Sequence, residues 1–285
     1  IFHCADIGDQ NKVSTIIKNE KPAGLIHFAA DKAVNESVLN PLKYYHNNIG
    51  NLIKLLEVIN NFNLSSFIFS SSSTVYGEPS CVPVNEKTTI QPAFSPYGYT
   101  KQVGEKILTD FFKTKKQTSL TMLRYFNPIG AHPSSLIGEL PLGVPSNLVP
   151  HLTQTAIGKR KQLTIFGNDY NTADGTCIRD YIHVVDLARA HVLSLKNNII
   201  SNNVYNVGVG RGSSVLEVVN CFEEINNLKV NYQFGDRRSG DVPEIYADNS
   251  LIKKELNWEP KFSLKDALQH AWSWERELKS KYKID

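Results

Sequence analysis

Short apolar runs alternate with apolar residues at helical spacing along the first part of the chain. Short runs of this kind are typical of strands buried on both faces, whereas recurrence every three or four residues is typical of helices. The expected strands are 1–8, 24–30, 66–69 and 118–125, and the expected helices are 13–17, 41–59 and 97–112. This rhythm predicts a parallel sheet with crossover helices.

The pattern changes after residue 127. Residues 128–150 contain five prolines and form a loop that is too long to be incidental in a compact domain. The expected elements beyond it are helices 151–157 and 184–195, strands 162–166 and 204–207, and core anchors Trp258, Trp272 and Trp274. We therefore expect an α/β protein with a sheet domain over 1–127, to which strands near 182–207 return, and a smaller lobe over 128–285.

Composition narrows the functional classes. The 285 residues are 41% hydrophobic and carry a net charge of +3 from 31 basic and 28 acidic residues, which is too weak a charge to indicate a nucleic acid or membrane partner. No apolar run approaches the ~20 residues of a membrane span. The four cysteines lack the spacing of a metal site or of disulfides, which favours reduced thiols, no metal and a cytoplasmic location.

Tyr97 and Lys101 carry the strongest chemical signal. Four residues apart on a helix, they share one face, and a nearby cation favours the ionised form of a phenol. Such a pair is suited to taking a proton from an alcohol, although most pairs at this spacing are simply solvated. The hydroxyl run 70–74 strengthens the first interpretation, because it ends the strand at 66–69 and so lies at the carboxyl edge of the sheet.

Several stretches together resemble the UDP-glucose 4-epimerases, which belong to the extended short-chain dehydrogenase/reductase superfamily. The resemblance covers nearly the whole chain, in order, and rests on residues 67–77, 95–101, 123–133, 167–170, 179–184 and 237–241. It implies a Rossmann-like, doubly wound parallel sheet with a smaller C-terminal α/β lobe for the substrate. It also implies NAD as cofactor, a UDP-sugar as substrate and a homodimer formed through the helices at 41–59 and 97–112.

The resemblance implies roles for individual residues. Tyr97 would be the base at the sugar 4-hydroxyl, and Ser72, beside Thr74, would bridge the 4-oxygen. Lys101 would hydrogen-bond the nicotinamide ribose and, together with the positive nicotinamide ring, depress the Tyr97 pKa. The residues implied at the cofactor are Asp6, Ile7, Phe28, Ala29, Ala30, Lys32, Lys101 and Tyr125. Those implied at the substrate are Ser72, Phe126, Asn127, Asn147, Leu148, Thr164, Phe166, Arg179, Arg238, Asp241 and Ile245.

Two features depart from the family pattern. The glycine-rich loop, the first βα unit and the acid that reads the adenosine ribose would all precede Asp6, and the sequence begins with Ile1. We therefore expect a fragment of a longer protein that holds NAD poorly. Ile245 stands where family members that reject N-acetylated sugars carry tyrosine, which predicts some activity on UDP-GalNAc and UDP-GlcNAc.

Alternative functions differ in the residues that they need. Related sugar-nucleotide 4,6-dehydratases place an acidic pair just after the hydroxyl position, where this chain has Ser73, Thr74 and Val75. A decarboxylating relative would need glucuronate-recognition residues that we do not find. A non-catalytic NAD-binding regulator would not need a placed base, and an inactive fragment on the same fold stays open. The sequence favours an isomerase.

Overall fold

The computed structural model describes residues 1–197, 202–238 and 240–282. It divides into two compact units, which are described separately. Unit 1 comprises residues 1–79, 86–125 and 191–206, and unit 2 comprises residues 80–85, 126–190 and 207–285. Residues 80–85 and 182–190 thus belong to unit 2, and the expected domain boundary at 127 stays a prediction.

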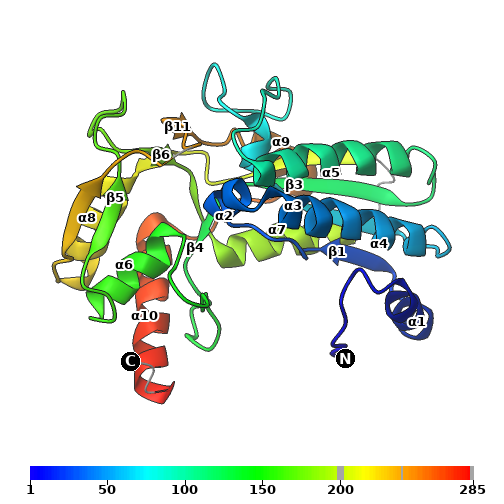
Figure 1. Ribbon diagram of the computed structural model, residues 1–285, viewed down its shortest axis with the longest axis horizontal. Helices are drawn as coiled ribbons and strands as arrows, with labels where there is room; N and C mark the ends of the chain where they lie inside the picture. The colour runs from blue at the N-terminus through cyan, green and yellow to red at the C-terminus, as the bar shows by residue number, and fades with distance from the viewer. Residues whose placement is uncertain (198–201, 239, 283–285) are drawn as a thin grey trace. The chain divides into compact units, whose positions relative to one another are not determined.

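Unit 1 is built on a sheet with the strand order β1-β2-β3-β8 (Figure 1). Its strands are β1 (Gly24–His27), β2 (Ser66–Ser72), β3 (Ser119–Tyr125) and β8 (Asn202–Val207), the last of which ends in unit 2. Its helices are α1 (Gln10–Glu20), α2 (Val34–Leu39), α3 (Pro41–Tyr44), η1 (Tyr45–Gly50), α4 (Asn51–Ile59), η2 (Ser73–Tyr76) and α5 (Pro96–Phe112). The pairs β1–β2 and β2–β3 are parallel, as the sequence predicts.

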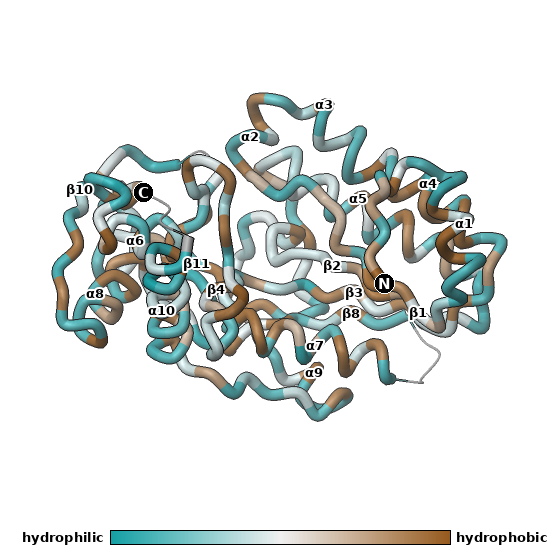
Figure 2. Tube along the Cα trace, turned by 90° about the horizontal axis from the view of Figure 1, so that it is seen from below, coloured by the Kyte–Doolittle hydropathy of each residue, from teal (hydrophilic) through white to brown (hydrophobic). Residues whose placement is uncertain are grey.

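Both faces of this sheet are covered, which explains why its strands are short apolar runs. On one face Phe67 and Phe69 of β2 pack in a core with residues of α1, α4 and α5. On the other face lies the last part of α7 (Val184–Lys196), whose His191 contacts Ser70. Because side chains alternate along a strand, Ser71 faces α5 while Ser70 faces α7. Figure 2 shows that hydrophobic and hydrophilic residues are mixed along α4, as expected for a helix with one buried face.

Unit 2 combines short strand pairs with three long helices. The helices are α6 (Leu148–Ala156), α8 (Val215–Asn226) and α10 (Leu264–Tyr282), with α9 (Ser250–Leu256) and the first part of α7. The strands are β4 (Asn127–Ile129), β5 (Leu163–Phe166), β6 (Ile178–Arg179), β7 (Tyr181–His183), β9 (Ser213–Ser214), β10 (Tyr232–Gly235) and β11 (Glu244–Ile245). They form the parallel pairs β5–β10 and β4–β7 and a three-stranded sheet in which β6 pairs parallel with β11 and antiparallel with β9. The core of the unit lies where α10 packs against α6 and α8.

Several expected elements differ from the observed ones. No strand forms over 1–8, and the strand expected over 24–30 ends at His27, after which Phe28 is exposed. The helix expected over 41–59 is three consecutive segments, of which Tyr45–Gly50 is π-helical. Of the three tryptophans, only Trp258 is fully buried. Within the described ranges no helix combines the length and the apolar character that crossing a bilayer requires.

Candidate active site

The first turn of α5 positions the two residues of the predicted acid–base pair. Ser95 caps the helix by accepting a hydrogen bond from the Gly98 amide (3.1 Å), and Pro96 fits the first helical position. Tyr97 and Lys101 are one turn apart and both buried, with 7% and 5% of their surface exposed. The structure therefore places both side chains inside unit 1, whereas an ordinary Tyr–Lys pair at this spacing is exposed to solvent.

Lys101 is held by the end of strand β2. Its Nζ donates a hydrogen bond to the backbone carbonyl of Ser70 (2.8 Å) and lies 5.8 Å from the centre of the Tyr97 ring. Ser72, the last residue of β2, forms a side-chain hydrogen bond with Tyr97. The hydroxyl run and the Tyr–Lys pair, predicted from separate stretches of sequence, thus meet at the carboxyl end of β2.

Burial governs the pKa of both groups of this pair in the protein by itself. The pKa of Tyr97 is raised by burial and by the neighbouring Tyr125, and the hydrogen bond from Ser72 only partly offsets this. Burial lowers the pKa of Lys101 to about 8. In the protein by itself both groups are removed from water, and desolvation disfavours both charges. The depression of the Tyr97 pKa by Lys101 together with a bound nicotinamide ring stays a prediction.

Thr74 contributes a hydroxyl that the protein leaves unpaired. Its Oγ1 is buried and has no hydrogen-bond partner among the described residues. Its backbone amide donates to the Ser72 hydroxyl (3.2 Å), so the two side chains are adjacent. A buried hydroxyl without a partner costs free energy, and it is therefore suited to receive an oxygen of a bound molecule.

Glu105 is a buried charge that the sequence analysis did not single out. It lies one turn beyond Lys101, and its carboxylate accepts from Arg124 Nε (2.9 Å), Arg124 Nη2 (2.6 Å) and Ser71 Oγ (2.6 Å). Arg124 also donates to the Tyr76 hydroxyl (3.2 Å). This network joins β2, β3 and α5 one helical turn beyond Lys101. The signal for it was the spacing of Glu105, four residues after Lys101 on the same helix face.

The residues predicted at the cofactor lie mainly at strand ends of unit 1. Asp6 accepts from the Gly8 amide in a turn (2.6 Å), and Ile7 packs against the sheet core. Phe28 is 59% exposed, Ala29 and Lys32 are exposed, and Ala30 is partly buried. The ring of Phe28 lies 4.6 Å from His191 and that of Tyr125 lies 6.2 Å from it. Sequence reasoning missed His191, whose Nε2 is 3.1 Å from the Ser70 hydroxyl.

In unit 2, Thr164 and Phe166 share one face of β5. Leu163 and Ile165 point into the core, so their alternates point outward. The Arg238 guanidinium lies 4.4 Å from the centre of the Phe166 ring. Arg238 Nε is buried and has no hydrogen-bond partner among the described residues, so it can donate to a bound anion.

A second arginine in unit 2 faces one of the predicted acids. Arg179 Nη2 is 3.4 Å from Asp241 Oδ1, and its Nη1 donates to the backbone carbonyl of Ile178 (2.9 Å). Ile245 is paired with Arg179 in the parallel register of β6 and β11, and it is 5% exposed. The structure therefore brings together three residues that are up to 66 positions apart in sequence.

The remaining predicted substrate residues lie around α6 and β4. Asn147 directly precedes α6, which begins at Leu148, and donates from Nδ2 to Glu139 Oε1 (3.0 Å). Asn127 is exposed and its amide donates to the Asp180 carbonyl (2.9 Å). Phe126 is only 4% exposed, so its ring packs inside the unit. Leu148 is partly buried.

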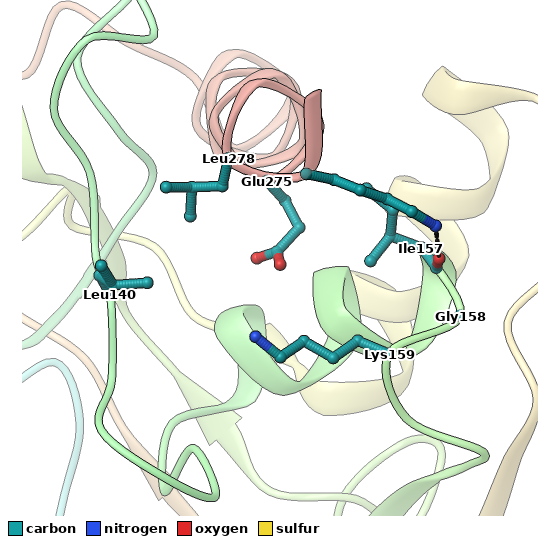
Figure 3. Close-up of a pocket in the computed structure, with 7 residues that line it drawn as sticks. Leu140, Ile157, Gly158, Lys159, Glu275 and Leu278 are labelled. Atoms are coloured by element: carbon teal, nitrogen blue, oxygen red, sulfur yellow. Dashed lines mark hydrogen bonds between the residues drawn. The ribbon is translucent and has the colours of Figure 1, made fainter. Parts of the chain in front are cut away.

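Unit 2 also has a pocket that none of the predicted site residues lines (Figure 3). Its wall includes Leu140, Lys159, Glu275 and Leu278. Burial raises the pKa of Glu275, and its Oε2 accepts from Thr153 (3.1 Å). Among the residues that the structure describes, no group of three histidine, cysteine or acidic side chains could hold a metal ion.

Comparisons with known proteins show the family of the chain. Residues 1–271 match the family model described as GDP-mannose 4,6 dehydratase. The UDP-glucose 4-epimerase of Bacillus subtilis (strain 168) is 45% identical over 284 residues, which are 99% of this chain and 84% of that protein.

Two solved structures are similarly close. The UDP-glucose 4-epimerase of Bifidobacterium longum in complex with NAD+ and UDP has a TM-score of 0.94 and 40% identity, covering 96% of this chain and 82% of that one. That of Stenotrophomonas maltophila, with bound NAD and formylated UDP-arabinopyranose, has a TM-score of 0.94 and 41% identity, covering 98% and 84%. By these matches the chain belongs to the UDP-glucose 4-epimerase family.

Proposed function

We propose that the chain interconverts UDP-galactose and UDP-glucose by transient oxidation at carbon 4 of the sugar, with NAD as cofactor. The observation that carries the proposal is the buried group of Tyr97, Lys101 and Ser72 beside the unpaired Thr74 hydroxyl. A placed base of this kind serves proton transfer to or from an alcohol. The epimerase relatives, 45% identical over nearly the whole chain, support the same reaction.

In this mechanism Tyr97 removes the proton of the sugar 4-hydroxyl and later returns it. Ser72 and Thr74 hold the 4-oxygen, Thr74 with a hydroxyl that has no hydrogen-bond partner in the described part of the chain. When bound beside these residues, NAD would supply the hydride acceptor for carbon 4 and the hydride donor for its re-reduction. Lys101, fixed by the Ser70 carbonyl, hydrogen-bonds the nicotinamide ribose and keeps a proton donor next to Tyr97.

The strand ends of unit 1 fit a dinucleotide. Its carboxyl edge offers an exposed aromatic ring, Phe28, and a phenol, Tyr125, on either side of His191. Ligands of open parallel sheets bind at this edge. We assign Tyr125 to the nicotinamide, Phe28, Ala29, Ala30 and Lys32 to the pyrophosphate, and Asp6 and Ile7 to adenine.

We propose that unit 2 binds the UDP portion. Arg179 and Arg238 would clamp the pyrophosphate, since a guanidinium presents several donors in a fixed fork. The Arg238 Nε has no partner among the residues that the structure describes. Asp241 would accept from the uridine ribose. The other assigned contacts are Thr164 and Phe166 at uracil and Phe126, Asn127, Asn147 and Leu148 at the sugar diphosphate, Phe126 through its backbone.

We further propose a homodimer in the cytoplasm. Leu42, Tyr45 and Tyr99 are exposed on helices of unit 1, and the rings of Tyr45 and Tyr99 lie edge to face at 6.3 Å. Apolar side chains on helical surfaces favour a second copy as partner. The four cysteines are free thiols, which fits a reducing compartment.

The alternatives are less well supported. A 4,6-dehydratase needs carboxylates after the hydroxyl position, and Ser73, Thr74 and Val75 provide none. A non-catalytic regulator has no use for a phenol and an ammonium that are both buried at a free-energy cost. Both alternatives predict no formation of UDP-glucose from UDP-galactose.

The test is the conversion of UDP-galactose to UDP-glucose by the purified chain with NAD. A hybrid that carries the N-terminal segment of the Bacillus subtilis relative is measured beside it. Conversion by the chain or by the hybrid supports the proposal. If the hybrid is folded and binds NAD but converts nothing, the epimerase function is wrong and the regulator becomes the better reading.

Ile245 supports a second substrate class. Its side chain is buried beside Arg179, and an isoleucine leaves more room there than a tyrosine ring would. We propose that UDP-GalNAc and UDP-GlcNAc are also interconverted. Ile245→Tyr should abolish turnover of UDP-GalNAc and retain turnover of UDP-galactose. If the unsubstituted chain turns over UDP-galactose but not UDP-GalNAc, the proposal is contradicted.

A further inference from the structure

Two consecutive arginines follow β10 in unit 2, and each rests on an aromatic ring from the end of β5. Arg238 lies over Phe166, and Arg237 lies 4.3 Å from the centre of the Tyr170 ring. The strands explain the match, because β5 and β10 are parallel and Phe166 is paired with Gly235. The segments that leave the two strands therefore run side by side.

Arg237 makes a more specific contact than an ordinary surface ion pair. Its Nε donates to Asp169 Oδ1 (2.7 Å) and its Nη2 donates to the backbone carbonyl of Asp169 (2.6 Å). The turn is shaped for this contact, since a Cβ at Gly167 (φ +78°) would come within 2.4 Å of Tyr170 and 3.1 Å of Arg237. A fork and a ring stack together fix a guanidinium far better than one exposed charge pair does.

Arg238 has few such restraints of its own. It rests on Phe166, and its Nε is buried without a hydrogen-bond partner among the described residues. The direction in which it presents its donors therefore depends on the backbone of its neighbour, which the contact between Arg237 and Asp169 holds to the turn at 167–170.

We propose that Arg237 is a positioning residue for the diphosphate of the bound nucleotide. It does so by anchoring the backbone from which Arg238 reaches the anion, and Asp169 is its counterpart. The inference rests on the proposed function, because it takes Arg238 to bind the diphosphate. Loss of this contact should weaken the binding of a diphosphate ligand and should not change the binding of a ligand without phosphates.

Asp169 provides a test of sign. If Arg237 acted only as a positive charge near the phosphates, removing the carboxylate of Asp169 would strengthen anion binding. If Arg237 is a positioning residue, Asp169→Asn weakens binding of UDP, because the fork loses its charged acceptor. The two accounts thus predict opposite changes for one substitution.

The experiment measures the affinity of the full chain for UDP and for uridine by calorimetry, without NAD. We expect the dissociation constant for UDP to rise roughly 10- to 100-fold in Arg238→Ala, the scale of a lost charge-assisted hydrogen bond. Arg237→Ala and Asp169→Asn should raise it roughly fivefold or more. Uridine affinity should change little in Arg237→Ala and Asp169→Asn.

Matched controls separate positioning from general charge effects. Arg237→Lys keeps the charge and loses the fork, so it should weaken UDP binding. Lys253→Ala breaks an exposed ion pair with Glu259 elsewhere in unit 2 and should change nothing. In turnover assays the Arg237 variants should raise KM and leave kcat unchanged.

Two results would be decisive against the inference. If Arg238→Ala weakens UDP binding but Arg237→Ala does not, or if Asp169→Asn tightens it, Arg237 does not position Arg238. If the original chain binds no UDP, or if Arg238→Ala binds it normally, the assignment of Arg238 fails instead, and the inference fails with it.

Discussion

The acid–base group of unit 1 and the Arg237 contact of unit 2 hold charge in opposite ways. In unit 1, Tyr97, Lys101, Glu105 and Arg124 are all 5–7% exposed, and burial shifts the pKa of both Tyr97 and Lys101. In unit 2, the Arg237 side chain is 49% exposed, rests on the buried ring of Tyr170 and keeps a charged partner, Asp169. Proton transfer profits from groups whose pKa is displaced by a dry environment, whereas an anion is best held by cations that never lose their charge. The following predictions test this contrast, beginning with the largest effect.

The phenol of Tyr97 should be indispensable for turnover in unit 1. Tyr97→Phe removes the proton acceptor and should lower the rate with UDP-galactose and NAD roughly 10²- to 10⁴-fold. Affinity for UDP, assigned to unit 2, should not change. Tyr99→Phe is the matched control, because Tyr99 lies on the same helix and is 50% exposed. Near-normal turnover by Tyr97→Phe would refute the assignment of the base.

Loss of one partner of the buried ion pair should be costly. Glu105→Gln leaves Arg124 charged inside unit 1, and should lower the free energy of unfolding by about 3–5 kcal/mol in urea titrations. The double substitution Glu105→Leu and Arg124→Leu should recover much of this loss. Asp169→Asn, at the exposed pair of unit 2, should leave the unfolding midpoint unchanged. Equal effects of the two single substitutions would contradict the contrast.

The buried ammonium of Lys101 should make stability depend on pH. Its pKa is about 8 in the folded chain against an ordinary value of 10.5, so the unfolded state binds more protons between these values and stability rises with pH there. Lys101→Met removes this cost, on the order of 3 kcal/mol at neutral pH. The advantage of the variant should therefore shrink between about pH 8 and 10.5. A constant difference across this range would disprove a lowered Lys101 pKa.

The smallest effect concerns the unpaired hydroxyl of Thr74. Thr74→Val breaks no hydrogen bond of that hydroxyl within the described structure, so the free energy of unfolding should stay the same or rise slightly. Turnover should nevertheless fall roughly 5- to 15-fold, if the hydroxyl binds the sugar oxygen. A variant with normal turnover would show that Thr74 has no part in the reaction.

The sequence predicts those parts of the site that depend on local spacing. Tyr97 and Lys101 share a helix face by simple periodicity, and the hydroxyl run follows an apolar strand. The spacing of Glu105 places it on the Lys101 face of the helix but does not show that it is buried, since a glutamate on an amphipathic helix is ordinarily solvated and its partner Arg124 comes from β3. The Arg237 contact depends on the register of β5 and β10, which no local pattern reveals.

The raised pKa of Tyr97 has a related explanation. The spacing of Tyr97 and Lys101 shows that a cation lies near the phenol. How deeply the two groups are buried depends on the assembled sheet and helices. Lys101 is itself desolvated and hydrogen-bonded to a carbonyl, so the expected depression of the Tyr97 pKa does not follow from proximity alone. Likewise, the π-helical turn over Tyr45–Gly50 lies within a stretch whose apolar spacing reads as one continuous helix.

The division of the chain bears on how the molecule is made. Unit 1 takes its fourth strand, β8, from residues after 201, and the chain passes between the units at 79, 85, 125, 190 and 206. A ribosome must therefore synthesise residues of both units before the sheet of unit 1 can be completed. For the same reason, no single cut in the gene separates the two units, so recombination could exchange neither half intact with that of a related enzyme.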